Sequence, residues 1–89
     1  MYQVSYTKKA IKSLSKLDNN ARYLILKWIH KNLVNCSDPL TIPQMKYLKG
    51  KRLNYVRYRV GDYRIICFIE GEKLIINVID VGHRKEIYQ

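Results

Sequence analysis

The stretch "YVRYRVGDYRIICF", residues 55–68, decides the fold because it has the pattern of two β-strands joined by a tight turn. β-Branched, aromatic and arginine residues alternate on both sides of Gly61 and Asp62, and a short Gly-containing link between such runs is typical of a hairpin. The sequence therefore predicts strands over 55–60 and 63–69.

A two-residue loop fixes which residues of this hairpin are neighbours. Val60 then faces Tyr63, Arg59 faces Arg64, and Tyr58 faces Ile65. Side chains alternate along a strand, so one face carries apolar residues that can be buried and the other carries three arginines: Tyr58, Val60, Tyr63, Ile65 and Cys67 on the first, Arg57, Arg59 and Arg64 on the second. Like charges opposite each other destabilise a hairpin by about 0.2 to 1 kcal/mol per pair, so the arginines call for an explanation.

The remaining elements surround this hairpin. Another strand is expected over 73–81, after the turn "EGE", and a short one over 2–6. Thr7 is the expected N-cap of a helix whose apolar face holds Ala10, Ile11, Leu14 and Leu17. A second helix follows the "DNN" break at 18–20, with Ala21, Leu24, Ile25, Trp28, Ile29 and Leu33 at helical spacing.

These elements predict an α+β fold in the order β-αα-βββ, with an antiparallel sheet packed on an N-terminal helical hairpin. Pro39 and Pro43 indicate that residues 36–54 form a loop, or a loop with one short helical turn. Helices joined in this way pack on one face of the sheet and leave the other face open for function. A chain of 89 residues has room for one core, so a single domain over 1–89 is expected.

The net charge of the chain indicates what kind of molecule it binds. Seventeen Lys and Arg against seven Asp and Glu give a net charge of +10, which favours a polyanion such as nucleic acid, or an acidic protein. No run of apolar residues is long enough for a signal peptide or a membrane span, so a cytoplasmic protein without a membrane partner is expected.

The pattern of potential metal ligands argues against a metal site. Cys36 and Cys67 lie 31 residues apart with no histidine ligands near them, which indicates neither zinc binding nor a disulfide framework. The carboxylates are scattered, mostly in predicted turns, and no glycine-rich phosphate loop is present. We expect no metal and no cofactor.

The three arginines of the hairpin have two interpretations. They are either solvated surface groups that point away from one another, or a cluster that is preorganised for an anion because the anion relieves their repulsion. The charge of the chain favours the second. The predicted loop adds further basic residues that could contact RNA: Lys46, Lys49, Lys51 and Arg52.

A second motif, "VGHRKEIY" at 81–88, brings His83, Arg84 and Tyr88 together where the chain leaves the last strand. Cleavage of RNA by its own 2′-OH needs a proton acceptor, a proton donor and positive charge on the phosphorane, but no metal. Arginines supply the charge, a histidine can supply one of the proton transfers, and a tyrosine can stack on a base. His30, within the second predicted helix, is interpreted as an ordinary surface histidine.

In order along the chain, "LKG" at 48–50, "RYRVGDYRII" at 57–66 and "VGHRKEIY" at 81–88 resemble the RelE branch of the RelE/ParE toxin superfamily. The N-terminal "KKAIKSLSKLD" is similar to the first helix of that family, so the resemblance covers nearly the whole chain. It implies a toxin of a type II toxin–antitoxin system that cuts mRNA in the ribosomal A site and so inhibits translation. It also implies a cognate antitoxin, acidic or amphipathic, encoded beside the toxin.

The resemblance also implies roles for individual residues. Arg64 and Arg84 match the arginines that stabilise the phosphate, and Tyr88 matches the C-terminal tyrosine that stacks on or orients the substrate. Arg57 and Arg59 lie where some members carry a basic residue that helps to activate the 2′-OH. His83 resembles the acid/base histidine of YoeB-like relatives.

This chain departs from the family pattern at the general base. The lysine pair of the best-known RelE pattern is replaced near Tyr55 and at Arg57, and the loop offers Gln44 where YoeB-like relatives use a glutamate. The base is therefore unassigned. Two alternatives stay open: a ParE-like poison of DNA gyrase on the same fold, and an inactive relative that only binds nucleic acid.

Overall fold

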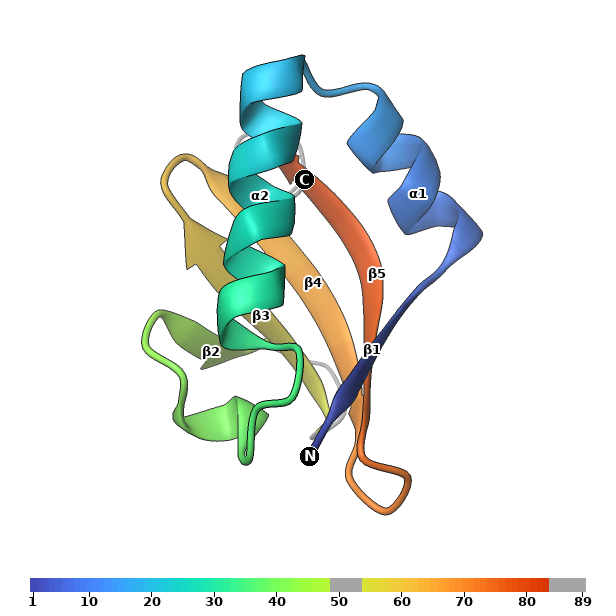
Figure 1. The fold of residues 1–89 in the computed structure, drawn as a ribbon, viewed down its shortest axis with the longest axis vertical. Coiled ribbons are helices and arrows are strands. Elements are labelled where there is room, and N and C mark those ends of the chain that lie inside the picture. Colours follow the sequence, from blue (N-terminus) through green and yellow to red (C-terminus); the bar gives the residue numbers. More distant parts are fainter. Residues whose placement is uncertain (49–53, 84–89) are drawn as a thin grey trace.

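The computed structural model describes residues 1–48 and 54–83. Within them the chain forms two α-helices, one short 3-10 helix and five strands, in the order β1 (Gln3–Tyr6), α1 (Lys8–Ser15), α2 (Asn19–Asn32), the 3-10 helix (Pro39–Thr41), β2 (Met45–Tyr47), β3 (Tyr55–Val60), β4 (Tyr63–Glu70) and β5 (Ile75–His83). Both α-helices lie on the same side of the sheet, with α2 crossing in front of β3 and β4 (Figure 1). The predicted α+β fold with a helical layer on one face is confirmed.

The five strands form one mixed sheet in the order β1-β5-β4-β3-β2. The predicted antiparallel pairing is confirmed for β3, β4 and β5, but the sheet is not antiparallel throughout, because β1 pairs with β5 in parallel, with Gln3 opposite Ile75. The two helices and three other strands separate β1 from β5 along the chain, which gives the long connection that a parallel pair requires.

The predicted register of the central hairpin is confirmed. β3 and β4 pair Val60 with Tyr63, Arg59 with Arg64 and Tyr58 with Ile65. Gly61 adopts a positive φ of 59° in the turn, a conformation that glycine reaches without steric cost.

The segment predicted as a loop contains more structure than expected. Its short helical turn is the 3-10 helix, which Asp38 caps by accepting a hydrogen bond from the Leu40 backbone N–H at 3.0 Å. Its second part is β2, which the sequence did not predict. β2 pairs with β3 and brings Met45 opposite Tyr58, so that Met45 packs against the core.

α1 begins after Thr7, the N-cap expected from the sequence, whereas α2 begins within the predicted "DNN" break, at Asn19, with Asp18 as its N-cap. The Thr7 side chain accepts a hydrogen bond from the Ala10 N–H at 3.1 Å, and the Asp18 carboxylate accepts one from the Ala21 N–H at 2.7 Å. These caps satisfy backbone donors that have no partner inside the helix. Thr7 also donates a hydrogen bond to the carbonyl of Ile79, which ties α1 to β5.

The core lies between the helices and the sheet, where alternate residues of β3, β4 and β5 meet the buried faces of α1 and α2. Tyr58 is at its centre, fully buried, with its hydroxyl donating to the Pro39 carbonyl at 2.7 Å and its ring 5.4 Å from that of Trp28. Cys67 is also fully buried, as predicted, and both cysteines carry free thiols. Burial raises the pKa of both Tyr58 and Cys67 above the usual values, because it disfavours the charged form. None of the described helices is long and apolar enough to cross a membrane.

Candidate nucleic-acid interface

The face of the sheet that points away from the helices carries a cluster of basic side chains. Arg59 lies directly opposite Arg64, and the next row pairs Lys46 of β2 with Arg57 and Arg57 with Ile66. Directly paired residues project to the same side of a sheet, so Lys46, Arg57, Arg59 and Arg64 share one surface. We call these four residues the basic face.

The basic face concentrates positive charge in partly shielded surroundings. Lys46 and Arg59 are exposed, whereas Arg57 and Arg64 are half-buried. The Nε and Nη1 atoms of Arg64 are out of contact with solvent. Charge–charge interactions strengthen where water is excluded, so an anion that reaches this guanidinium is bound more strongly than on an open surface.

Asp80 belongs to the same side of the sheet by its pairing, but α1 engages its carboxylate. Asp80 pairs with Ile66, and its carboxylate accepts hydrogen bonds from the Ser13 hydroxyl at 2.7 Å and the Val81 N–H at 2.9 Å. Its second oxygen lies 3.5 Å from Nζ of Lys9. Asp80 is therefore held by the helix layer rather than offered to the arginines.

His83 is on the neighbouring strand, as expected, but on the other face. The register between β4 and β5 shifts between Ile66 and Cys67, where β5 contains one extra residue, Ile79. After this β-bulge the alternation of β5 is reversed, which places Gly82 opposite Arg64 and His83 opposite Tyr63. The rings of His83 and Tyr63 meet edge to face, with centroids 5.7 Å apart.

His83 therefore lies on the helix side of the sheet, at the last position of β5, and not within the basic face. Without the bulge, the alternation set by Ile76 and Val78 would have placed it beside the arginines. His30 is exposed on α2, as predicted. The other candidates, Lys49, Lys51, Arg52, Arg84 and Tyr88, lie outside the described residues.

Sequence reasoning missed an aromatic pair that lies beside the basic face. Tyr55 and Phe68 are directly paired on β3 and β4, with ring centroids 4.9 Å apart and a tilt of 49°. Alternation places them on the same side of the sheet as Arg57 and Arg64. The sequence alone could have placed this pair on the basic side, because residues two apart on a strand share a face. Tyr55 is two residues from Arg57, and Phe68 is two residues from Ile66, which pairs with Arg57.

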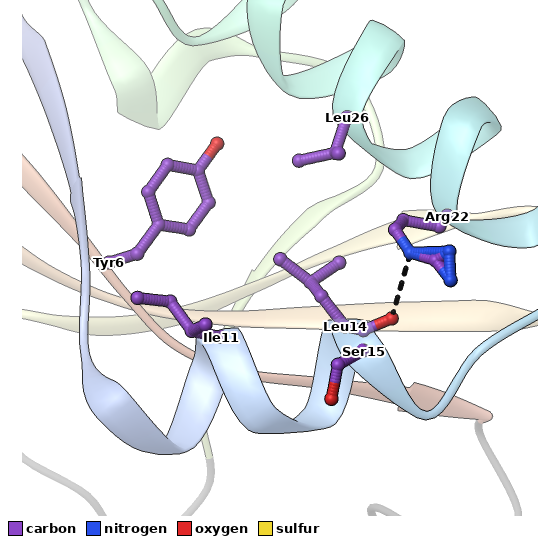
Figure 2. A pocket seen from close by; sticks show the side chains of 6 residues that line it. All are labelled: Tyr6, Ile11, Leu14, Ser15, Arg22 and Leu26. Atoms are coloured by element: carbon purple, nitrogen blue, oxygen red, sulfur yellow. Dashed lines mark hydrogen bonds between the residues drawn. The ribbon is translucent and has the colours of Figure 1, made fainter. Parts of the chain in front are cut away.

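A separate apolar groove lies on the helix side, between α1 and α2 (Figure 2). Its volume is about 420 Å³, and it is lined by Tyr6, Ile11, Leu14, Ser15, Arg22 and Leu26. Arg22 donates from Nε to the Leu14 carbonyl at 3.3 Å, which fixes one end of the groove. Ile11, predicted to belong to the apolar face of α1, is 57% exposed at its rim.

The described residues 1–48 and 54–83 contain no group of three or more His, Cys, Asp or Glu side chains close enough to hold a metal ion.

Two comparisons with known proteins, one with family models and one with individual sequences, both identify toxins. The model of the ParE toxin of the type II toxin–antitoxin system parDE matches residues 4–88. A RelE-like toxin protein of Escherichia coli is 32% identical over 84 residues, which cover 94% of this chain and 84% of that protein.

Two solved toxin–antitoxin complexes contain a chain of similar fold. In the RelB–RelE antitoxin–toxin complex of Methanococcus jannaschii, the matching chain is 30% identical with a TM-score of 0.62, over 94% of each chain. In the RelBE2 complex of Mycobacterium tuberculosis it is 24% identical with a TM-score of 0.75, over 93% of this chain and 98% of the other.

Proposed function

Since the chain belongs to the ParE toxin family of type II toxin–antitoxin systems, within the RelE/ParE superfamily that its "GDYR" and "GHR" motifs predicted, we propose that it is an endoribonuclease that cleaves mRNA in the ribosomal A site. The observation that carries the proposal is the basic face: Lys46, Arg57, Arg59 and Arg64 converge on the side of the sheet that the described helices leave uncovered.

The basic face suits the charge that develops when RNA cuts itself. Attack of a 2′-OH on the adjacent phosphate gives a pentacoordinate phosphorane with added negative charge. Guanidinium groups that are fixed before the substrate arrives stabilise that charge without having to reorganise, and they form paired hydrogen bonds with phosphate oxygens. Arg64 is best placed for this task, because part of its guanidinium is shielded from water.

Proton transfer to the departing 5′ oxygen falls, in this proposal, to His83. It follows Gly82, which is paired with Arg64, so its backbone is one residue from the phosphate site. The leaving 5′ oxygen is bonded to the phosphorus that Arg64 stabilises, so in this proposal one phosphate lies at the end of the sheet, where the Arg64 guanidinium reaches it from one face and the His83 imidazole from the other. Histidine is suited to this transfer because it can exchange a proton near neutral pH.

The proposed function is tested by primer extension on ribosomes programmed with a defined mRNA, incubated with the purified chain. Cleavage at the A-site codon, and none of the same mRNA without ribosomes, is the expected result. A parallel gyrase supercoiling assay serves as the second arm. Blocked supercoiling with intact mRNA would instead identify a gyrase poison, the activity that the resemblance to ParE-like toxins leaves open.

A protein antitoxin is the partner that this function requires. Matching chains of solved structures were determined in complex with RelB antitoxins. A net charge of +10 calls for an acidic partner. We assign to it the groove between α1 and α2, where apolar side chains are exposed and lysines line the outer side of α1, and we expect an apolar segment with acidic flanks to occupy it.

The assignment of the groove can be checked with the protein encoded by the adjacent gene. Ile11→Asp places a carboxylate at the rim of the groove and is expected to weaken the complex at least tenfold in a titration. Leu40→Asp is the matched control, because Leu40 is also exposed, at 40%, but lies in the 3-10 helix away from the groove. Equal affinities of the two variants would remove the groove from the interface.

A further inference from the structure

The side of the sheet that bears the basic face has two chemically different ends. At one end are Arg59 and Arg64, whose charge suits phosphate. At the other end, four residues further along each strand, are Tyr55 and Phe68. Strand residues rise about 3.3 Å each, so the two ends are about 13 Å apart, a distance that a short single strand of RNA can span.

The aromatic end opens into a hollow of about 460 Å³, lined by Asn54, Phe68, Glu70, Gly71, Glu72 and Lys73. This hollow lies beside β4 and the turn that leads to β5, and it is distinct from the groove between the helices. Tyr55 and Phe68 are half-buried and contribute nothing to the main hydrophobic core, which indicates that core packing alone does not account for two aromatic residues here.

Hydrogen bonds hold one side of the hollow in place. Asn77 donates from Nδ2 to Oε1 of Glu70 at 2.8 Å and to the Phe68 carbonyl at 3.2 Å. The Ser5 hydroxyl in turn donates to Oδ1 of Asn77 at 2.7 Å. Lys73 lies 3.5 Å from the other oxygen of Glu70. These contacts span β1, β5 and β4 and orient Glu70 beside the Phe68 ring.

The chemistry of this hollow points to a nucleobase rather than a phosphate. Glu70 and Glu72 outnumber Lys73 in the lining, so the hollow carries a net negative charge that repels a phosphate, whereas carboxylate oxygens accept hydrogen bonds from the amino groups of bases. Aromatic rings stack on the face of any base, and single-stranded RNA is commonly bound in this way. A basic end and an aromatic, acidic end thus match the two parts of a nucleotide chain.

We propose that the Tyr55–Phe68 pair and the hollow beside it form a nucleobase-binding subsite for the RNA strand whose phosphate lies on the basic face. The proposal rests on the proposed function for the identity of the strand. It predicts that bases which carry amino groups are preferred at this position, because the hollow offers acceptors.

Binding rather than cleavage tests the subsite. The probe is a short fluorescent RNA with 2′-O-methyl groups, which cannot be cut, and its anisotropy is measured with the full chain. Phe68→Leu removes the ring but keeps an apolar side chain, and it is expected to weaken binding between about fivefold and a hundredfold. Tyr55→Leu should have a similar effect and serves as the second variant if Phe68→Leu does not fold, which circular dichroism checks.

Two controls separate stacking from a general loss of structure. Tyr47→Leu removes an aromatic side chain that is 54% exposed on the edge strand β2, and it should leave the affinity unchanged. A series of probes, each lacking the base at one position, should contain one that binds the wild-type chain weakly and that shows no further loss with Phe68→Leu. The proposal is wrong if, for every probe, the loss of affinity from the missing base and the loss from Phe68→Leu multiply. It is also wrong if Tyr47→Leu weakens binding as much as Phe68→Leu does.

The outcome is independent of the nuclease activity. A chain that cuts mRNA but binds the probe with no dependence on Phe68 and Tyr55 would retain the proposed function and overturn the subsite. A chain that binds the probe through these residues but never cuts mRNA would retain the subsite and overturn the proposed function.

Discussion

The two faces of strand β3 differ in a way that separates stability from function. Val56, Tyr58 and Val60 are at most 6% exposed and pack beneath the helices, while Arg57 and Arg59, between them, point to the other side. Five successive residues thus serve two purposes. We therefore expect substitutions of the buried residues to lower the stability of the fold, and substitutions of the arginines between them to lower activity with little loss of stability.

The largest effect on folding is expected at Tyr58. Tyr58→Ala removes a fully buried ring and leaves a cavity, so the free energy of unfolding should fall by about 3 to 5 kcal/mol. Arg59→Ala, one residue away, should change it by less than about 0.5 kcal/mol because Arg59 is exposed. Urea unfolding followed by circular dichroism measures both, and similar losses in the two variants would refute the division of the strand.

The next largest effect is expected on activity at the end of β5. His83→Ala should lower the rate of A-site cleavage by about 100- to 10,000-fold if the imidazole transfers a proton in the reaction. His30→Ala is the matched control, since His30 is exposed on α2, and it should cut at the wild-type rate. Full activity of His83→Ala would remove His83 from the mechanism and leave the basic face to act with another proton donor.

The hairpin was predictable from the sequence because alternation and the Gly61 turn act locally. Pairing of Arg59 with Arg64 followed from those two features alone. The cap Thr7 was predictable for the same reason, since a cap bonds to a backbone N–H three residues away.

The position of His83 was not predictable, because it depends on a single extra residue. Nothing in "NVIDVGH" marks Ile79 as the site of a β-bulge. In the structure the bulge coincides with the carbonyl of Ile79 accepting from Thr7 and with Asp80 accepting from Ser13, contacts more than 60 residues apart in the chain. β2 was missed because a strand of three residues carries too little alternation to be recognised.

A smaller effect on the free energy of unfolding is expected at high pH, and it arises from the helix-covered face of the sheet. Burial raises the pKa of the Cys67 thiol, so the folded chain keeps this group neutral while the unfolded chain ionises it above about pH 8.5. Its contribution to stability is complete below that pH and is lost as the pH rises, by up to about 1.4 kcal/mol per pH unit.

The alkaline loss can be assigned by comparing slopes rather than absolute stabilities. Urea unfolding of Cys67→Val between pH 8 and pH 10 should show a shallower decline than that of the wild-type chain. Parallel declines would show that the buried thiol does not contribute and that other groups, such as Tyr58, govern alkaline unfolding.

The smallest effect is expected where the helix layer is joined to the β-bulge. Thr7→Ala removes both the cap of α1 and the hydrogen bond to Ile79, and should cost about 0.5 to 2 kcal/mol of stability. Ser15→Ala is the comparison, because the Ser15 hydroxyl donates to the Lys12 carbonyl of its own helix, in an exposed turn of α1. The midpoint of thermal unfolding should be clearly lower for Thr7→Ala than for Ser15→Ala. The reverse order would contradict the role given to Thr7.

The most direct test of the basic face is the single-turnover rate of A-site cleavage by Arg64→Ala on programmed ribosomes, measured beside that of Lys27→Ala. Arg64 belongs to the basic face, whereas Lys27 is exposed on α2. Loss of a preorganised group that stabilises the phosphorane should slow Arg64→Ala by about 100- to 1,000-fold, with Lys27→Ala unchanged. A folded Arg64→Ala protein that cuts at the wild-type rate would contradict the claim that the uncovered face of the sheet carries the function.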